Sequence, residues 1–440
     1  MSPRPAIPVR ALNGKLLAED MASLDHRWRA RYLLLAPHRL GFFLAMVVLV
    51  AAAVWWALVQ LDRMTGALGL AYAMSPSLVH GALMTFGFIP LFFSGFLFTA
   101  GPKWLDVPPI AIRQLLAPML LQAGGWLLWL AAAHFHAGLA LAALLVAWTG
   151  LAWMTWLFWR LIRRSTAQDR VHALTVGTAC IVGCISVAAL MISLALDAPA
   201  VALACVLTGL WGFVLVVYLA VAHRMIPFFT SGALPRMDAW RPFWLLGLML
   251  AVAAFEVAAV WIESAGPPGG SAGVAWTLVR GTLELAAGGL LLWLALKWGL
   301  VRSLKNRLLA MLHIGFVWLG LALALGGIAQ WLGWAQGTVV LSLGSVHALT
   351  MGCLASLMLA MVTRVSCGHS GRALVADRIA WSLFWLLQVA TLMRIAGAAP
   401  SAWAGGLLLA AALLWAAIMA MWGLRLGSWY GRLRADGRPG

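Results

Sequence analysis

The stretch LGFFLAMVVLVAAAVWWALVQ, residues 40–60, decides the fold class of this chain. It carries no charged residue, and about 20 consecutive apolar residues are enough for an α-helix to cross a bilayer. Eleven further apolar runs of similar length follow it, and we expect membrane spans near 40–60, 77–100, 111–132, 140–161, 173–195, 200–221, 242–262, 276–297, 307–329, 339–363, 378–398 and 402–424. The sequence therefore predicts an all-α integral membrane protein, a bundle of about 12 transmembrane helices.

The composition supports this fold class. Of 440 residues, 64% are hydrophobic and 10% are charged, with a mean hydropathy of +0.95, whereas a soluble domain has about 25% charged residues. A transmembrane barrel would show short alternating segments, and the sequence has none. The first apolar run begins only after Arg39 and is long enough to span, so we expect no cleavable signal peptide.

Basic residues are distributed asymmetrically along the chain. The net charge is +17, and 27 of the 30 Lys and Arg residues fall on one side of the membrane if the N-terminus is cytoplasmic. The exceptions are Arg63, Arg280 and Arg394. This pattern follows the positive-inside rule and predicts that both termini are cytoplasmic. The basic charge therefore indicates contact with the lipid bilayer rather than with nucleic acid.

We expect three parts in the chain: a polar basic cytoplasmic arm at 1–38, a twelve-helix transmembrane domain at 39–425, and a basic cytoplasmic tail at 426–440. The five cysteines fall in spans or on the cytoplasmic side, so disulfides are not expected. Cys180 and Cys184 share a helix face. They are either a metal-binding pair or small residues that pack in a helix interface.

Two histidines lie toward the outer side of the membrane. His80 is near the outer end of the second span, and His347 is about eight residues, or about 12 Å, into the tenth. Ionisable residues inside a membrane are costly and usually functional. Two facing imidazoles can hold a haem iron axially among apolar side chains. The alternative is that each ring hydrogen-bonds a neighbouring carbonyl.

A second set of histidines lies toward the inner side, at His38, His172, His223 and His313. If the helix order brings several of them together, they form an imidazole-rich site suited to copper or a second haem. His38 and His223 each adjoin an arginine at the membrane interface, so an interfacial role is the alternative for them. His369 lies in the inner loop that follows the tenth span, where it either contacts the cytoplasmic edge of a haem or orders that loop.

Few other charged groups fall within spans. Arg280 and Arg394 lie near outer ends, where an arginine can clamp haem propionates or extend to the interface. Glu284 follows Arg280 by four residues, which predicts an ion pair within one helix. Glu256 has no obvious local partner, so it either relays protons or is protonated and hydrogen-bonded.

Five segments of the sequence resemble the NnrS family of bacterial membrane proteins. They are HGALMTFGFIPLFFSGFLFTAGPKW (80–104), PHRLGFF from Pro37, HRMIPFFTSG from His223, LLAMLHIGFVWLGLAL from Leu308, and SVHALTMGCLASLMLAMVTRVSCGHSGR (345–372). The last is the most specific, because Thr363-Arg364 is followed by the Gly-His-Ser-Gly-Arg ending around His369. The resemblance covers essentially the whole chain. It implies twelve spans, haem and copper, and a role in denitrification and nitric oxide stress.

One feature departs from the family pattern. The second span of the family usually begins with His-x-His-Glu, whereas Ala82 and Leu83 stand at the second histidine and the glutamate here. The departure weakens the expectation of copper or a second ligand at this end, and it indicates a divergent branch.

The segment from His80 is also similar to the second span of haem-copper oxidase catalytic subunits, which carries a low-spin haem ligand in an H-G-x-x-M-x-F context. The partner histidine of those subunits comes from the tenth span, where His347 falls. The adjacent His-His pair, the His-Pro-Glu segment and the His-x-His of the tenth span are missing. The similarity therefore implies the oxidase-like fold and a low-spin haem, without the oxygen-reducing copper centre.

These observations together predict a protein of the bacterial inner membrane that binds haem b, with His80 and His347 as axial ligands, and handles nitric oxide. If one haem keeps an open axial position, nitric oxide is its ligand, and a quinol or a cytochrome would supply electrons for a nitric oxide reductase type of reaction. A sensor or a haem- or copper-handling protein without turnover is the alternative. A transporter is less favoured, because Pro90 is a helix break without a matching partner.

Overall fold

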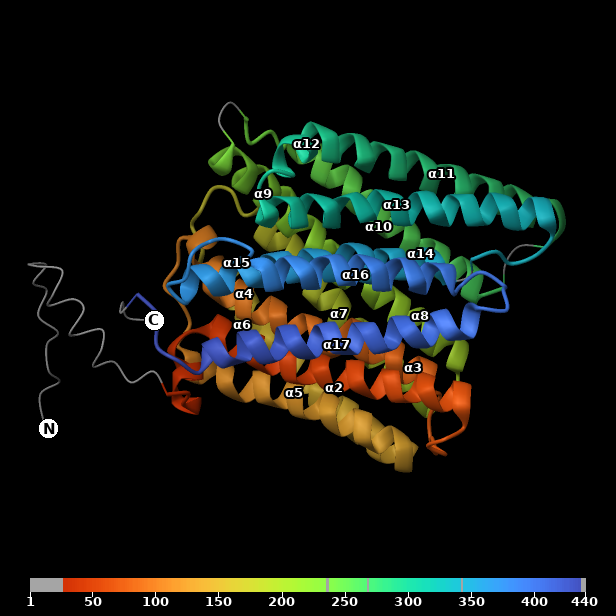
Figure 1. Ribbon diagram of the computed structural model, residues 1–440, viewed down its shortest axis with the longest axis horizontal. Coiled ribbons are helices and arrows are strands. Elements are labelled where there is room, and N and C mark those ends of the chain that lie inside the picture. The colour runs from red at the N-terminus through yellow and green to blue at the C-terminus, as the bar shows by residue number, and fades with distance from the viewer. Residues whose placement is uncertain (1–26, 235–236, 267–268, 342, 437–440) are drawn as a thin grey trace, which may run out of the picture.

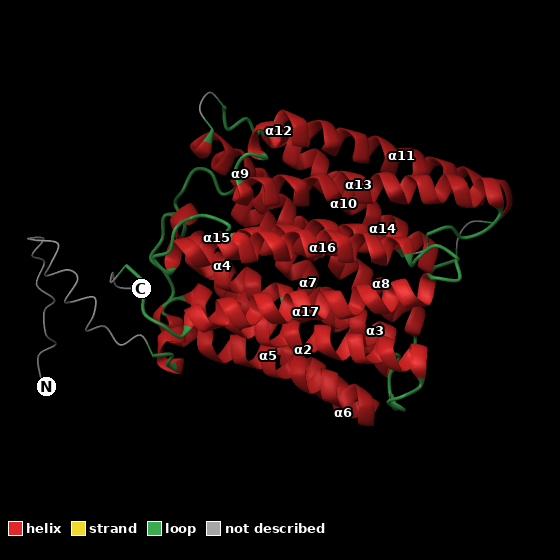
Figure 2. Ribbon diagram, viewed as in Figure 1, coloured by secondary structure: helices red, strands yellow, loops and turns green. Residues whose placement is uncertain are grey.

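The structure is a computed structural model that describes residues 27–234, 237–266, 269–341 and 343–436. Within these residues every regular element is a helix, and Figure 2 shows helices joined by loops. Twelve of the described helices are long and apolar enough to cross a membrane, which confirms the expected multi-pass bundle. In chain order they are α2 (Pro37–Thr65), α3–η2–α4 (Pro76–Leu105), α5 (Ile112–Phe135), α6 (Ala137–Arg164), α7 (Val171–Ala195), α8–η3–α9 (Pro199–Ala233), α10 (Phe243–Ser264), α11 (Gly270–Lys297), α13 (Arg307–Gln336), α14–η4–α15 (Gly344–His369), α16 (Arg378–Ala396) and α17 (Ala404–Tyr430).

The second, sixth and tenth spans each contain a π-helical segment within an otherwise α-helical span. A π-helix has one more residue per hydrogen-bonded turn than an α-helix, and such turns are rare and often lie at functional sites. The three segments in the described chain are η2 (Leu83–Gly87), η3 (Gly209–Leu215) and η4 (Ala348–Ala355). They divide these spans into an outer half, α3, α8 or α14, and an inner half, α4, α9 or α15.

The first and last spans lie side by side, so the bundle is closed by its two ends (Figure 1). The described chain ends also lie together, at one end of the bundle. There the backbone N–H of Arg29 donates to the carbonyl of Gly431 at 2.8 Å. The guanidinium of Arg39 donates to the carbonyl oxygens of Tyr430 at 3.2 Å and Arg432 at 2.6 Å. We call this the inner end and the opposite one the outer end.

The expected basic arm at 1–38 lies largely outside the described residues, since residues 1–26 are not described. Its described part includes a short 3₁₀-helix, η1 (Ala30–Leu35), that packs against α2. Another short helix, α12 (Leu300–Ser303), connects α11 to α13 at the inner end.

Helices α11 and α13 form an antiparallel pair that extends beyond the neighbouring helices at one end in Figure 1. Their backbones approach closely at small residues, the packing mode that membrane helices favour. A Cβ atom on Gly288 would lie 2.6 Å from the carbonyl oxygen of Gly320, and a Cβ on Gly320 would lie 2.8 Å from that of Gly288. Only glycine fits at these two crossing points.

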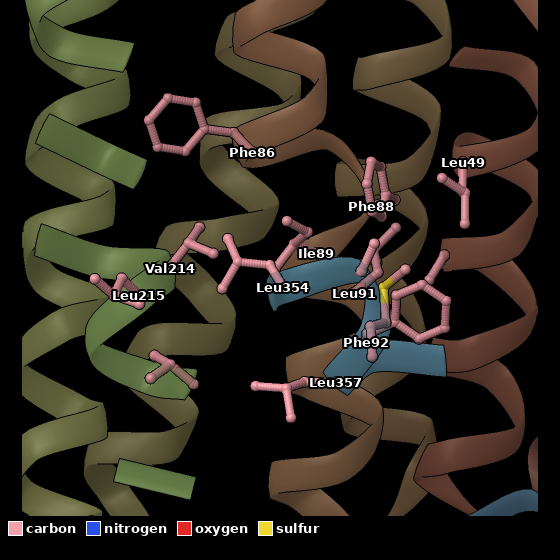
Figure 3. Close-up of a cluster of buried hydrophobic side chains, with 14 of the residues drawn as sticks. Leu49, Phe86, Phe88, Ile89, Leu91, Phe92, Val214, Leu215, Leu354 and Leu357 are labelled. Carbon is pink, nitrogen blue, oxygen red and sulfur yellow. The ribbon is translucent and has the colours of Figure 1, made fainter. Parts of the chain in front are cut away.

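The three π-helical segments all contribute to the centre of the bundle. Figure 3 shows Val214 of η3 and Leu354 of η4 pointing toward Ile89, just after η2. Phe86 of η2 packs where Gly209 of η3 has no side chain, and a Cβ there would overlap its ring. The apolar centre therefore lies directly inward of the two helix starts that carry His80 and His347.

Candidate functional site

His80 and His347 occupy equivalent places at the outer end. His80 lies in the short helix α3 (Pro76–Ala82) and His347 ends the four-residue helix α14 (Gly344–His347), and a π-helical segment begins within three residues of each. The expectation that His347 lies eight residues into its span was wrong. Helix α13 ends at Gln336 and α14 begins only at Gly344, so His347 is in the first turn.

The ring of His347 is oriented by its own helix. Its Nδ1 lies 2.8 Å from the carbonyl oxygen of Leu343. A carbonyl only accepts, so Nδ1 carries the proton and Nε2 is left with a free lone pair. Metal-binding histidines commonly make this hydrogen bond, which fixes the tautomer and the ring orientation.

His80 is held by stacking rather than by a hydrogen bond. Its ring lies 3.9 Å from that of Trp56 between centroids, with an angle of 16° between the planes. Its buried Nδ1 has no hydrogen-bond partner among the described residues. Trp56 is in turn covered by Arg63, whose guanidinium carbon lies 5.2 Å from the ring centroid. His80 and His347 lie close enough to interact electrostatically, so the structure brings the predicted pair together.

Arg394 of α16 joins this pair. It is close enough to interact electrostatically with both His80 and His347. Within the described part of the chain its guanidinium makes no hydrogen bond and no ion pair. A partly buried arginine without an anionic partner is suited to a carboxylate from outside the chain. His80 Nδ1 and His347 Nε2 have no hydrogen-bond partner in the described chain, so with the Arg394 guanidinium they supply the side-chain groups that a haem with a propionate would use.

Arg280, the other arginine predicted to contact propionates, belongs to a different site. Its Nε donates to Glu284 Oε1 at 2.8 Å, which is the expected pair within one helix. A second nitrogen lies 3.3 Å from Glu256 Oε2, and the third contacts Glu263. Its guanidinium is therefore committed to carboxylates of the chain itself. The local sequence around Glu256 had shown no partner because its partner is on the neighbouring helix.

The four inner histidines are not brought to one place. His172 of α7 and His223 of α9 form a pair, with Nε2 of His172 lying 3.0 Å from Nδ1 of His223. His223 Nε2 lies 3.2 Å from the carbonyl oxygen of Pro242. Because that carbonyl only accepts, His223 carries its proton on Nε2 and accepts from His172 on Nδ1. The two rings are thus held by hydrogen bonds, and His172 Nδ1 is left buried without a partner in the described chain.

His313 of α13 lies apart from this pair and is fully buried. Its Nε2 lies 3.0 Å from Thr230 Oγ1, and that hydroxyl donates to the carbonyl of Ile226 at 2.8 Å. The threonine therefore accepts from His313, which leaves His313 Nδ1 buried without a partner.

The fourth inner histidine, His38, pairs with His369, a pairing that sequence reasoning missed. Their ring centroids are 4.3 Å apart with an angle of 40° between the planes. The rings are in contact, so a porphyrin does not fit between them in this arrangement. Lys103 and Arg434 add positive charge around His369. The only signal in the sequence was that both histidines fall on the inner side.

No group of three His, Cys, Asp or Glu residues placed to hold a metal ion occurs in the described chain. The thiol of Cys184 lies 3.4 Å from Thr155 Oγ1 and Cys180 is buried, and both are free thiols, as packing residues would be. Arg364, part of the most specific family-like segment, lies over the ring of Phe229 at 3.9 Å. A copper site with three or more protein ligands is therefore not formed by these residues.

Comparison with known protein families identifies the family of this chain. A family model described as NnrS protein matches residues 32–434. The match includes all twelve spans and every histidine and arginine of the outer and inner groups. No curated protein matches the chain. Because the matched region is nearly the whole sequence, this chain belongs to the NnrS family.

Proposed function

We propose that this chain is a haem-binding protein of the bacterial inner membrane that acts in the nitric oxide response. Membership of the NnrS family suggests a role in that response. The observation that supports the haem assignment is the outer group, in which His80, His347 and Arg394 lie within electrostatic range of one another. All three side chains retain binding capacity that the described chain does not use.

Each residue of this group has a distinct role in the proposal. His347 would bind iron through Nε2, because its Nδ1 is occupied by the Leu343 carbonyl. His80 would be the second ligand, and Trp56 stacks on its ring. Arg394 would hold a propionate. A haem b supplies an iron that changes oxidation state and can bind nitric oxide.

The proposed reaction is the reduction of nitric oxide. Two molecules of nitric oxide take up two electrons and two protons to give nitrous oxide and water, with a quinol or a cytochrome as the electron donor. Nitric oxide binding without turnover, in a sensor or a haem- or copper-handling protein, is the second candidate. A haem- or copper-handling role needs no vacant position on the iron, so two histidine ligands favour that role over a reaction at the haem.

The optical spectrum of the purified protein tests this proposal. We expect a Soret band, a change on reduction, and a further change when nitric oxide is added to the reduced protein. The absence of a Soret band would overturn the haem assignment. Consumption of nitric oxide with a reductant supports the enzyme, whereas a spectral change without consumption supports the sensor.

A second haem or a copper ion, if present, would lie at the inner end. Nδ1 of His38, of His172 and of His313 is buried without a partner in the described chain. Of these three, His38 has a second histidine ring against it that is not hydrogen-bonded to it, so His38 and His369 are the candidates there. The positive charge around them opposes a cation. Metal analysis of the wild type and a His38→Ala variant shows whether a copper ion binds at the inner end. Such an ion would be lost from the variant without loss of the outer haem.

A further inference from the structure

A cavity of about 1030 Å³ lies between helices α8, α10, α11, α13 and α14. Its mouth is at the outer end, where it is lined by the helix starts and loops that include Ala200, Gly270 and Val339. Val339 is 78% exposed, so the cavity is open at this mouth. The deep wall is formed by Arg280 and the carboxylates around it.

Two of these carboxylates are buried, and each has a partner on only one of its two oxygens. Glu256 is 1% exposed and Glu284 is 4% exposed, and each uses one oxygen on Arg280. The other oxygens, Glu256 Oε1 and Glu284 Oε2, are buried without a partner in the described chain. The two carboxyl groups lie within hydrogen-bond reach of each other. Glu256 lies eight residues, or about 12 Å, from the outer end of α10.

The charges of this group do not balance unless a proton is present. With both buried carboxylates ionised, Arg280 would leave one negative charge uncompensated away from water, which is strongly unfavourable. One proton on the pair removes that charge. Its O–H would also donate from one unpartnered oxygen to the other, so a single proton satisfies both.

The other titratable group facing the pair is Glu263, whose side chain is 42% exposed and stays solvated near the mouth. The residues that α8, α13 and α14 contribute to the cavity wall, within the described ranges, are apolar or neutral, such as Gln330 and Ser345. The proton balance of the site is therefore set by Arg280, Glu256 and Glu284.

We propose that Glu256 and Glu284 bind one exchangeable proton, which enters from the outer side through this cavity. The site lies beside the helix that carries His347. A Cβ on Gly326 would lie 2.7 Å from Glu284 Oε2 and 3.6 Å from the Cβ of Ser345, two residues before that histidine. Resting on the proposed function, the pair would supply a proton that nitric oxide reduction consumes.

Infrared difference spectroscopy of the purified protein tests the proton site. We expect a carboxylic acid C=O band at neutral pH that shifts when the solvent is changed to D₂O. The band should disappear in Glu256→Gln and in Glu284→Gln, because an amide cannot share a carboxyl proton. It should persist in Glu263→Gln, the matched control at the mouth.

Absence of the band in the wild type, or its persistence in both buried variants, would overturn the proposal. The two variants are isosteric and independent, so failure of one to fold leaves the other as the test. Access is tested by Gly273→Trp, which narrows the cavity and should slow exchange of the carboxyl proton with D₂O. Gly289→Trp, on the open face of the same helix, is the control and should not slow it. Neither measurement needs haem or nitric oxide, so its failure is distinct from failure of the proposed function.

Discussion

The Nδ1 atom of His347 lies 2.8 Å from the carbonyl oxygen of Leu343, one helical turn earlier in the chain. This hydrogen bond gives His347 one tautomer and one ring direction. His80, its partner, is held only by stacking on Trp56. The two proposed ligands therefore differ in how firmly the protein presents them.

We predict that His347→Ala removes haem more completely than His80→Ala. His347→Ala leaves only His80, whose ring direction no hydrogen bond sets. Hydrogen bonds that orient a metal ligand commonly contribute about 10–100-fold in metal affinity. The measurement is the haem content per protein after purification. His136→Ala, at the exposed start of α6, is the control and should retain full haem. Equal haem loss in both ligand variants would contradict the assignment.

Arg394 should set the reduction potential of the proposed haem. A positive charge favours the reduced state, so Arg394→Gln should lower the potential by on the order of tens of millivolts. Arg394→Lys keeps the charge and should shift it less. Potentiometric titration of the haem spectrum checks both. An unchanged potential in Arg394→Gln would show that this side chain does not face the haem.

The close crossing of α11 and α13 predicts different effects on stability for alanine at two neighbouring glycines. Gly288→Ala places a Cβ against the Gly320 backbone and should lower the free energy of unfolding by about 1–3 kcal/mol. Gly289→Ala, one residue on, meets nothing within 4 Å and should be neutral or stabilising by up to about 1 kcal/mol. Thermal unfolding in detergent compares them, and equal effects would contradict the described helix contact.

The ion pair of Asp377 with Arg425 should make stability depend on pH. Hydrogen bonds from Arg425, and then from the backbone of Ala380, hold the pKa of Asp377 below its ordinary 3.8. The contribution is therefore present above that value and is lost as the pH falls through the lowered pKa. Its size is below about 1 kcal/mol, since the Asp377 side chain is 49% exposed.

Asp377→Asn isolates this charge, because asparagine also caps a helix start. The variant should unfold more easily than the wild type at neutral pH, and the difference should vanish in acid. A difference that is constant with pH would mean that the side chain acts through packing instead.

The spans could be predicted from the sequence because each one is a long apolar run, and the Arg280–Glu284 pair because i and i+4 share a helix face. Helix order in space could not. The sequence offered four inner histidines as one set, but which of them meet depends on how α2, α7, α9, α13 and α15 pack. The contact between His38 and His369 joins residues over 300 positions apart.

Two local features could not be predicted from the sequence, because the same apolar composition occurs in different kinds of local structure. The residues around 339–341 are as apolar as a span, yet they precede α14, so His347 lies nearer the outer end than expected. The π-helical segments contain ordinary apolar residues, and no residue type distinguishes them from an α-helix. Both features affect the surroundings of a proposed ligand, since η2 follows His80 and η4 follows His347.

The contact between α2 and α17 has a consequence for biosynthesis. At about 5–20 residues per second, the ribosome finishes α17 on the order of tens of seconds after α2 has entered the membrane. Until then lipid or a chaperone must cover the face of α2 that α17 will occupy, and Arg39 has no Tyr430 or Arg432 carbonyl to bind. A chain that stops before residue 404 leaves the ring of helices open. Closure of the bundle thus reports that α17 has been made, and an open bundle is a distinguishable target for membrane quality control.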